Sequence, residues 1–364
     1  MKRLDRIAQV YEPISGGVPR YARTLSEKIN QGGRYQSTTF SPDPLADEQI
    51  CLSRSMKSVS LYRTEIEEIF EQYDLIHFHS YFALRWAFVR AGLGSMTTPF
   101  IFQPHALPTA AFQSQLLKTV AGRVLFSRLP DSVPSACLGS HEYAEVGRIP
   151  SLDPHMIGVG VDIEHYRPAT RVEIGAAREA LGIRPDDFAV SYIGRNDRQK
   201  GVDLFEELVK CCPEIHFVVA GPDLQALEPN TNVTYLGVVA DSWELLAASD
   251  CVVQTSRWEG ASLVALESQS MGLPVVAFDT IGGADALGSS GQLIEPFDIH
   301  AMRQALLSVR DKRVIDLRSD ELGLRRRRNE ISFDRAVERI ESLYGQTLGR
   351  EVETDESNVT YNYL

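Results

Sequence analysis

The second half of this sequence alternates short, continuous apolar runs with segments of helical periodicity. The runs 188–193 and 215–220 are each followed by glycine, and apolar residues recur at helical spacing in the segment 201–210 between them. Further strands are expected at 251–254 and 275–278, and further helices at 241–249 and 262–271. Continuous apolar strands that alternate with helices indicate a parallel sheet covered by helices on both faces.

The first half repeats this pattern less regularly, with strands expected at 7–11, 73–79 and 100–103 and a helix at 19–30. We therefore predict an α/β protein with two doubly wound, Rossmann-like domains. A length of 364 residues fits two domains of ~150 residues each. We place the boundary at Arg167–Pro168, before a helix expected at 171–181, which gives domains 1–167 and 168–330. The acidic segment 350–364 is expected to form a flexible tail.

The composition excludes several classes of protein. With 37 basic and 49 acidic residues, the net charge of −12 argues against a nucleic-acid partner. Apolar runs stay well below the ~20 residues of a membrane-spanning helix, and Asp5 stands where a signal peptide needs an apolar stretch. The five cysteines are odd in number and lack Cys-x-x-Cys spacing, which is typical of reduced thiols. We therefore expect a cytoplasmic protein.

A cluster of cations follows the strand at 188–193. Gly194 and Arg195 come directly after it, and Lys200 precedes the next helix. A helix N-terminus offers unpaired N–H groups, and arginine and lysine add charges suited to phosphate oxygens. The cluster therefore indicates a diphosphate site, with a solvated charged loop as the alternative. The Gly-Lys-Ser/Thr phosphate loop is absent, which argues against a P-loop nucleotidase.

Two glutamates, Glu259 and Glu267, flank the start of the helix expected at 262–271. Eight residues of helix rise ~12 Å, which exceeds the ~5–10 Å between the two carboxyls of a glycoside hydrolase. The pair is better suited to two separate parts of a long ligand, such as the ribose and the sugar of a nucleotide sugar. Taken without their context, they also fit two surface glutamates.

The first half offers fewer candidates. Gly16–Gly17 follows the first strand and would either let the backbone approach a ligand closely or turn the chain into a helix. His105 follows the strand at 100–103, which places it at the ligand-binding edge of the sheet or in an ordinary loop. His77 and His79 share one face of a strand. Because a third metal ligand is lacking, we favour a hydrogen-bonded structural role for His77 over a metal site.

The region 75–130 contains five basic residues and no acidic one. Such a local excess of positive charge in an acidic protein points to an anionic neighbour, either an acceptor or a membrane surface. Three of the cations are five residues apart, which spreads them around a helix. We therefore predict only a weak peripheral contact with the inner face of the membrane. The five cations are Arg85, Arg90, Lys118, Arg123 and Arg128.

In their shared order, these motifs resemble the retaining glycosyltransferases of family 4, which have the GT-B fold. The resemblance extends from Gly16–Gly17 to about Leu348. Its most specific part is the glutamate pair followed by Gly272–Val276 and Gly282–Gly283. Supporting matches are Gly194–Arg195, Lys200–Gly201, Gly160–Asp162 and Tyr166–Pro168. The resemblance implies two domains that face each other across a cleft, and a closing helix at about 331–349 that crosses back to the N-terminal domain.

The resemblance also implies a role for each candidate residue. Arg195 and Lys200 would neutralise the diphosphate of the donor, as Gly17 would through its backbone N–H. Glu267 would bind the ribose and Glu259 the transferred sugar, with His105 beside that sugar. The implied donor-binding residues are Gly16, Gly17, Gly194, Arg195, Lys200, Glu259, Gly260, Ala261, Ser262, Leu263 and Glu267. The implied catalytic residues are His105, Arg195, Lys200 and Glu259. No metal and no cofactor are implied.

The implied reaction moves a sugar from a nucleotide-diphosphate sugar to a hydroxyl of a glycan, a glycolipid or a small molecule, as in cell-envelope polysaccharide or glycoconjugate synthesis. Fixed positive charge would stabilise the leaving diphosphate. Departures from the family pattern at Asn196, Ser268–Ser270 and Ala284–Asp285 leave the identity of the donor open. Two alternatives also remain, a nucleotide-sugar epimerase of the same fold and a nucleotide-sugar-binding protein without catalysis.

Overall fold

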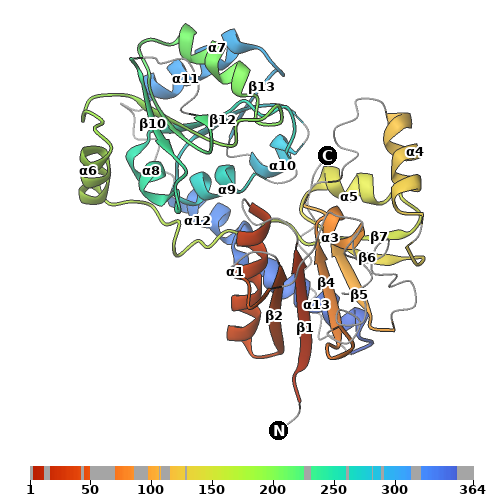
Figure 1. Cartoon of the computed structure of the whole chain (residues 1–364). Coiled ribbons are helices and arrows are strands. Elements are labelled where there is room, and N and C mark those ends of the chain that lie inside the picture. Colours follow the sequence, from red (N-terminus) through yellow and green to blue (C-terminus); the bar gives the residue numbers. More distant parts are fainter. Residues whose placement is uncertain are drawn as a thin grey trace. The chain divides into compact units, whose positions relative to one another are not determined.

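The computed structural model describes residues 3–11, 17–41, 45–49, 70–85, 97–105, 107, 115–127, 129–224, 231–259, 262–280, 282–287, 291–312 and 321–350. Contacts within the chain divide it into two compact units. Unit 1 comprises Met1–Cys137, Tyr143–Ile157 and Val337–Leu364, and unit 2 comprises Leu138–Glu142 and Gly158–Ala336. Each unit is built on its own parallel sheet (Figure 1).

Unit 1 contains a seven-stranded parallel sheet with the order β3-β2-β1-β4-β5-β6-β7. The strands are β1 (Asp5–Tyr11), β2 (Tyr35–Ser41), β3 (Glu48–Gln49), β4 (Leu75–His79), β5 (Phe100–Gln103), β6 (Val133–Cys137) and β7 (Leu152–Met156). The helices with residues in this unit are α1 (Gly17–Gly32), α3 (Tyr81–Arg85), α4 (Gln115–Leu125), α5 (Ser140–Val146) and α13 (Phe333–Thr347). The strand order reverses between β1 and β4, which makes their carboxyl ends the expected ligand site of this sheet.

Unit 2 contains a six-stranded parallel sheet with the order β10-β9-β8-β11-β12-β13. The strands are β8 (Ala189–Ile193), β9 (His216–Ala220), β10 (Val233–Gly237), β11 (Cys251–Gln254), β12 (Val275–Phe278) and β13 (Gln292–Ile294). The helices are α6 (Arg171–Ala180), α7 (Val202–Cys211), α8 (Trp243–Ala248), α9 (Leu263–Ser270), α10 (Gly283–Leu287), α11 (Ile299–Lys312) and α12 (Glu321–Glu330). Here the strand order reverses between β8 and β11.

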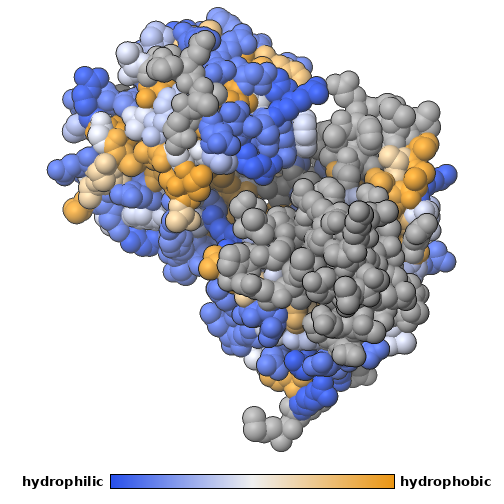
Figure 2. Space-filling view, viewed as in Figure 1, coloured by the Kyte–Doolittle hydropathy of each residue, from blue (hydrophilic) through white to orange (hydrophobic). Residues whose placement is uncertain are grey.

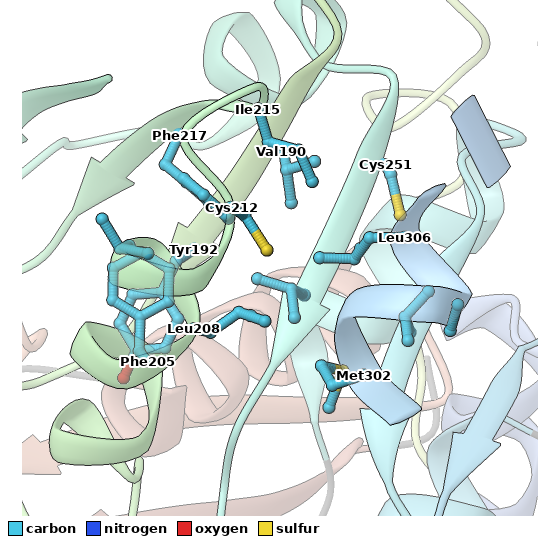
Figure 3. Packing of buried hydrophobic residues seen from close by; sticks show 14 of the residues in the cluster. Val190, Tyr192, Phe205, Leu208, Cys212, Ile215, Phe217, Cys251, Met302 and Leu306 are labelled. Atoms are coloured by element: carbon cyan, nitrogen blue, oxygen red, sulfur yellow. The ribbon is translucent and has the colours of Figure 1, made fainter. Parts of the chain in front are cut away.

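Helices cover both faces of the unit 2 sheet, which explains why its strands are apolar along their whole length. On one face, Val190 and Tyr192 of β8 pack in a cluster with Phe205 of α7 and Leu306 of α11 (Figure 3). The rings of Tyr192 and Phe205 are stacked, with centroids 4.2 Å apart. On the other face, Ala189 packs in a second cluster with residues of α8 and α9. These two layers confirm the predicted doubly wound sheet.

The boundary between the two units lies earlier in the sequence than we predicted. We predicted the boundary at Arg167–Pro168, whereas the contacts place it between Ile157 and Gly158. The intervening segment is attached to unit 2 because Val161 N donates to Ile331 O at 2.8 Å and Tyr166 Oη lies 3.0 Å from Ser242 Oγ. The chain returns to unit 1 from Val337 onward, within α13. The predicted tail 350–364 lies outside the described residues, apart from Arg350.

Candidate functional site

The candidate residues of unit 2 follow β8 and β11, the neighbouring strands at which the sheet order reverses. Gly194 and Arg195 come directly after β8, and Glu259 lies in the loop after β11. In a doubly wound sheet, the carboxyl ends of these two strands border the crevice that holds a ligand. The topology therefore brings two motifs that are remote in sequence to one site.

Lys200 and Glu259 form an ion pair at this site. Lys200 Nζ lies 2.6 Å from Glu259 Oε1, and their side chains are 17% and 5% exposed. Ser256 Oγ donates to the same carboxylate oxygen at 2.6 Å. Lysine has three N–H donors, and among the described residues Lys200 Nζ donates only to Glu259. The buried carboxylate thus holds an ammonium group that can still donate to a ligand.

The backbone of Lys200 is fixed by the residues around it. Tyr192 Oη donates to Lys200 O at 3.0 Å, and Thr255 Oγ1 donates to Lys200 O at 3.1 Å and to Gly201 O at 2.9 Å. Gly201 has a φ of 64°, and a Cβ at this position would lie 2.0 Å from Thr255 O. Only glycine fits here, so the close approach of the two loops depends on it.

Arg195 is held by its own loop. Its Nε donates to Asp197 Oδ2 at 2.9 Å, and one terminal nitrogen donates to Gln199 Oε1 at 3.2 Å. The other oxygen of Asp197 accepts from Lys200 N at 2.9 Å. The Arg195 side chain is 55% exposed, so it remains accessible to a ligand. Asp197 therefore holds the side chain of Arg195 and the backbone of Lys200.

Glu267 is almost fully buried on α9, and its Oε2 accepts from Ser242 Oγ at 2.9 Å. Ser242 in turn lies 3.0 Å from Tyr166 Oη, which donates to Asp241 Oδ1 at 3.1 Å. Burial rules out the alternative that Glu267 is an ordinary surface residue. Ser242 was not predicted as its partner, since no local signal links two residues 25 positions apart.

Three further residues of the family motifs, Ser262, Leu263 and Gly282, have defined roles in the fold. Ser262 caps α9, because its side chain accepts from Ala265 N, and Leu263 is the first residue of the helix. Gly282 has a φ of 76°, and a Cβ there would lie 2.1 Å from Glu259 O. The loop after β12 therefore packs directly on the backbone of Glu259. Gly16, Gly260 and Ala261 lie outside the described residues.

In unit 1, His105 comes shortly after β5, and Gly17 follows β1 in the sequence and is the first residue of α1. His105 Nε2 lies 2.9 Å from Nδ1 of the buried His79. Burial lowers the pKa of His105 to about 3, because a charged ring is poorly solvated there. His77 Nδ1 lies 2.9 Å from Tyr344 Oη, which agrees with the structural role favoured for His77.

The basic region 75–130 is described only in part. Among its five cations, Arg123 is the one whose side chain is described, and it is exposed on α4. The same helix exposes Val120 and Val124, at 52% and 67%, and Figure 2 shows hydrophobic surface at its position. Within the described part of the chain, no helix is long and apolar enough to span a membrane. The predicted membrane contact stays a prediction.

Residues 187–311 match a family model described as "Glycosyl transferases group 1". The segment includes β8 to β13 and every described candidate of unit 2. Over 334 residues the chain is 29% identical to an Escherichia coli UDP-Gal:α-D-GlcNAc-diphosphoundecaprenol α-1,3-galactosyltransferase, covering 83% of this chain and 82% of the relative. It is also 34% identical to D-inositol 3-phosphate glycosyltransferase of Mycobacterium marinum, over 42% of this chain and 37% of that protein.

Solved structures share the whole architecture at low identity. Anabaena HepE in complex with UDP-glucose superposes with a TM-score of 0.77 and 17% identity, over 93% of this chain and 99% of that one. Sucrose-phosphate synthase from Thermosynechococcus elongatus gives a TM-score of 0.76 and 18% identity, over 95% and 99%. The solved structures thus show the GT-B fold, and the matches in sequence identify a glycosyltransferase. The match of residues 187–311 to the group 1 glycosyltransferases agrees with the resemblance to family 4.

Proposed function

We propose that the chain is a retaining glycosyltransferase that moves a sugar from a nucleoside-diphosphate sugar to a hydroxyl of a glycan or lipid-linked acceptor. The observation that carries this proposal is the ion pair between the partly buried Lys200 and the buried Glu259, which lies in the same loop region as Arg195, where the order of the unit 2 sheet reverses. A diphosphate bound there would meet two cations, while buried carboxylates provide acceptors for hydroxyl groups.

The chemistry of the reaction fits these residues. When the bond between sugar and diphosphate breaks, negative charge builds up on the leaving group. Lys200 and Arg195 are already in place, held by Glu259 and Asp197. Fixed charges of this kind stabilise the transition state more than the ground state, since the charge on the leaving group grows during the reaction. No metal is needed for this step in the proposed mechanism.

The remaining assignments follow from the same arrangement. Glu267, buried and held by Ser242, would accept hydrogen bonds from the ribose hydroxyls, and Glu259 would contact the transferred sugar. For Gly17 and His105, which lie in unit 1, contacts with the diphosphate and the sugar stay a prediction. The names of the relatives suggest a first choice of substrates, with UDP-sugars as donors and a diphosphoundecaprenol-linked sugar as acceptor. With such an acceptor, the enzyme would work at the cytoplasmic face of the membrane.

The test is an incubation of the full-length protein with a panel of UDP-sugars and lipid-linked acceptors, with and without a chelator. We expect acceptor-dependent release of UDP that the chelator does not abolish, and a product whose anomeric configuration, determined by NMR, matches that of the donor. An inverted product would contradict the retaining mechanism. An epimerised donor without transfer would favour the epimerase, and tight binding without turnover would favour a binding protein.

A further inference from the structure

A continuous series of polar side chains lies beneath His105 in unit 1. His105 Nε2 is 2.9 Å from His79 Nδ1, and His79 Nε2 is 2.8 Å from Gln9 Oε1. Gln9 Nε2 donates to Tyr344 Oη at 2.9 Å, and Tyr344 Oη lies 2.9 Å from His77 Nδ1. Gln9, His77, His79 and Tyr344 are fully buried, so His105 is the one member that reaches the surface.

The amide of Gln9 determines which atom donates in each hydrogen bond between Gln9 and His105. Its Nε2 faces two hydroxyl oxygens, those of Tyr344 at 2.9 Å and Ser37 at 3.2 Å, which use both of its hydrogens. Its Oε1 faces His79, and a carbonyl oxygen only accepts, so His79 Nε2 must donate. A neutral imidazole carries a single N–H, which leaves His79 Nδ1 as an acceptor. The hydrogen between the two rings therefore belongs to His105 Nε2.

The surroundings of His79 keep its ring neutral. The pKa of His79 is held well below its usual value, first by burial and then by the neighbouring His77 and His105. The titratable side chains that face it are His77 and His105, whose rings lie 4.0 and 5.2 Å away between centroids, Tyr21 of α1 at 6.2 Å, and Tyr344 through Gln9. None of these groups carries a negative charge at neutral pH.

We propose that Gln9 and His79 are positioning residues that hold His105 in its Nε2-protonated tautomer and thereby present Nδ1 as an acceptor for a hydroxyl of the sugar substrate. Two further observations support a role in ligand binding. Among the described residues, no group donates to His105 Nδ1. His105 also has a φ of 56°, a conformation that is uncommon for residues other than glycine and recurs at functional sites. The role of Nδ1 rests on the proposed function.

The tautomer is measured directly by long-range ¹H–¹⁵N NMR of the histidine rings in the full-length, substrate-free protein. We expect His105 to show a protonated Nε2 and an unprotonated Nδ1. In Gln9→Met, which removes the acceptor for His79, we expect a mixture of tautomers at His105 and a kcat/KM lower by about tenfold, the factor that one hydrogen bond supplies. The control is Ser37→Ala. It removes a hydroxyl that accepts from Gln9 Nε2 but leaves Gln9 Oε1 on His79, so it should change neither the tautomer of His105 nor kcat/KM.

The variant Gln9→Glu provides a test that does not depend on Gln9→Met folding well. A carboxylate beside His79 Nε2 raises the pKa of that ring. Once protonated, His79 would donate from Nδ1 towards His105, which would then have to carry its own proton on Nδ1. Activity of Gln9→Glu should therefore be near that of the wild type at alkaline pH and fall as the pH is lowered, while its melting temperature does not follow the same curve.

Each outcome decides the proposal. A wild-type His105 protonated at Nδ1 would overturn it, as would a Gln9→Met protein with unchanged tautomers and turnover. A Gln9→Glu protein with the pH profile of the wild type would also count against it. Because the tautomers are measured without substrate, the predicted wild-type tautomer in a protein that transfers no sugar would instead indicate failure of the proposed function.

Discussion

At the level of single residues, the site of unit 2 depends on charges that the protein fixes in advance. Glu259 holds Lys200 by an ion pair of 2.6 Å, and Asp197 holds Arg195 by a hydrogen bond of 2.9 Å. Ordering a long side chain costs entropy. Because these side chains are already ordered by carboxylates, less of that cost would remain for the binding of the proposed diphosphate.

The first prediction concerns Lys200 itself. We expect Lys200→Ala to lower kcat by at least ~100-fold, because one fixed donor to the developing charge is lost. Steady-state kinetics with a UDP-sugar would measure this, alongside the melting temperature to show that the variant is folded. Lys210→Ala, at the exposed end of the same helix α7, is the control and should retain full activity. Near-normal turnover of folded Lys200→Ala would refute the proposed phosphate site.

At the level of secondary-structure elements, the turn into α7 is the most constrained. Gly201 is the N-cap of α7, in the left-handed conformation, and has Thr255 O against its Cα. We expect Gly201→Ala to lower the free energy of unfolding by at least ~1–3 kcal/mol, because the added Cβ forces the two loops apart. Chemical denaturation would measure it.

A matched control for that substitution lies in α6. Gly175 is helical there, and a Cβ would meet nothing within 4 Å. Gly175→Ala should therefore stabilise the protein by ~0.5–1 kcal/mol, through the gain in helix propensity. If both alanine variants changed stability by the same amount, the account of Gly201 would be wrong.

Helix α13 carries a pH-dependent element. Burial raises the pKa of Glu341, which has one carboxylate oxygen without a partner among the described residues, and Arg34 at 3.6 Å offsets the shift only in part. The folded state therefore binds this proton more tightly than the unfolded chain does, and stability falls as the pH rises through and above the ordinary carboxyl range.

From this sign, we expect Glu341→Gln to be more stable than the wild type at neutral pH, by an amount on the order of 1 kcal/mol, and to lose this advantage in acid. Denaturant unfolding at a series of pH values would show it. Glu207→Gln, exposed on helix α7, serves as control and should differ little from the wild type at any pH. An advantage that persists unchanged in acid would show that the carboxylate carries no such penalty.

A comparison of the strands shows which of them the sequence pattern is able to predict. Strands β8, β9, β11 and β12 were predicted within a residue or so, because burial on both faces leaves an unbroken apolar run. Strands at the edges were missed. β7 contains Asp153 and Pro154 and is only partly buried, and β10 is largely half-buried. One-sided burial at an edge leaves too weak a pattern for prediction.

The sequence points to the residue types of the candidate site but not to their pairings. Arg195, Lys200, Glu259 and Glu267 were each identified from the sequence, yet the contact between Lys200 and Glu259 spans 59 positions. It exists because β8 and β11 are neighbours in the sheet, which no local motif reveals. Gln9 was hidden in the same way, as the one polar residue in the apolar part of β1, residues 7–11.

At the level of the whole molecule, one architecture occurs twice. In each unit the strand order reverses beside the unit's first strand in sequence, and in each a candidate residue follows that first strand. Gly17 follows β1 in unit 1, and Gly194 follows β8 in unit 2. Each sheet thus offers a similar place for a ligand at the carboxyl ends of its strands. Among the described candidates, the charged side chains that suit a diphosphate are those of unit 2.

The most direct test of this central claim is a comparison of UDP and UMP binding by titration calorimetry, in the wild type and in Lys200→Ala. If Lys200 contacts the terminal phosphate of the diphosphate, the wild type should prefer UDP, and the variant should lose ~10-fold or more of that preference, as expected for a charge-assisted hydrogen bond. If UDP and UMP lost equal affinity, or neither lost any, Lys200 would serve only as the partner of Glu259 and the account of the site would be contradicted.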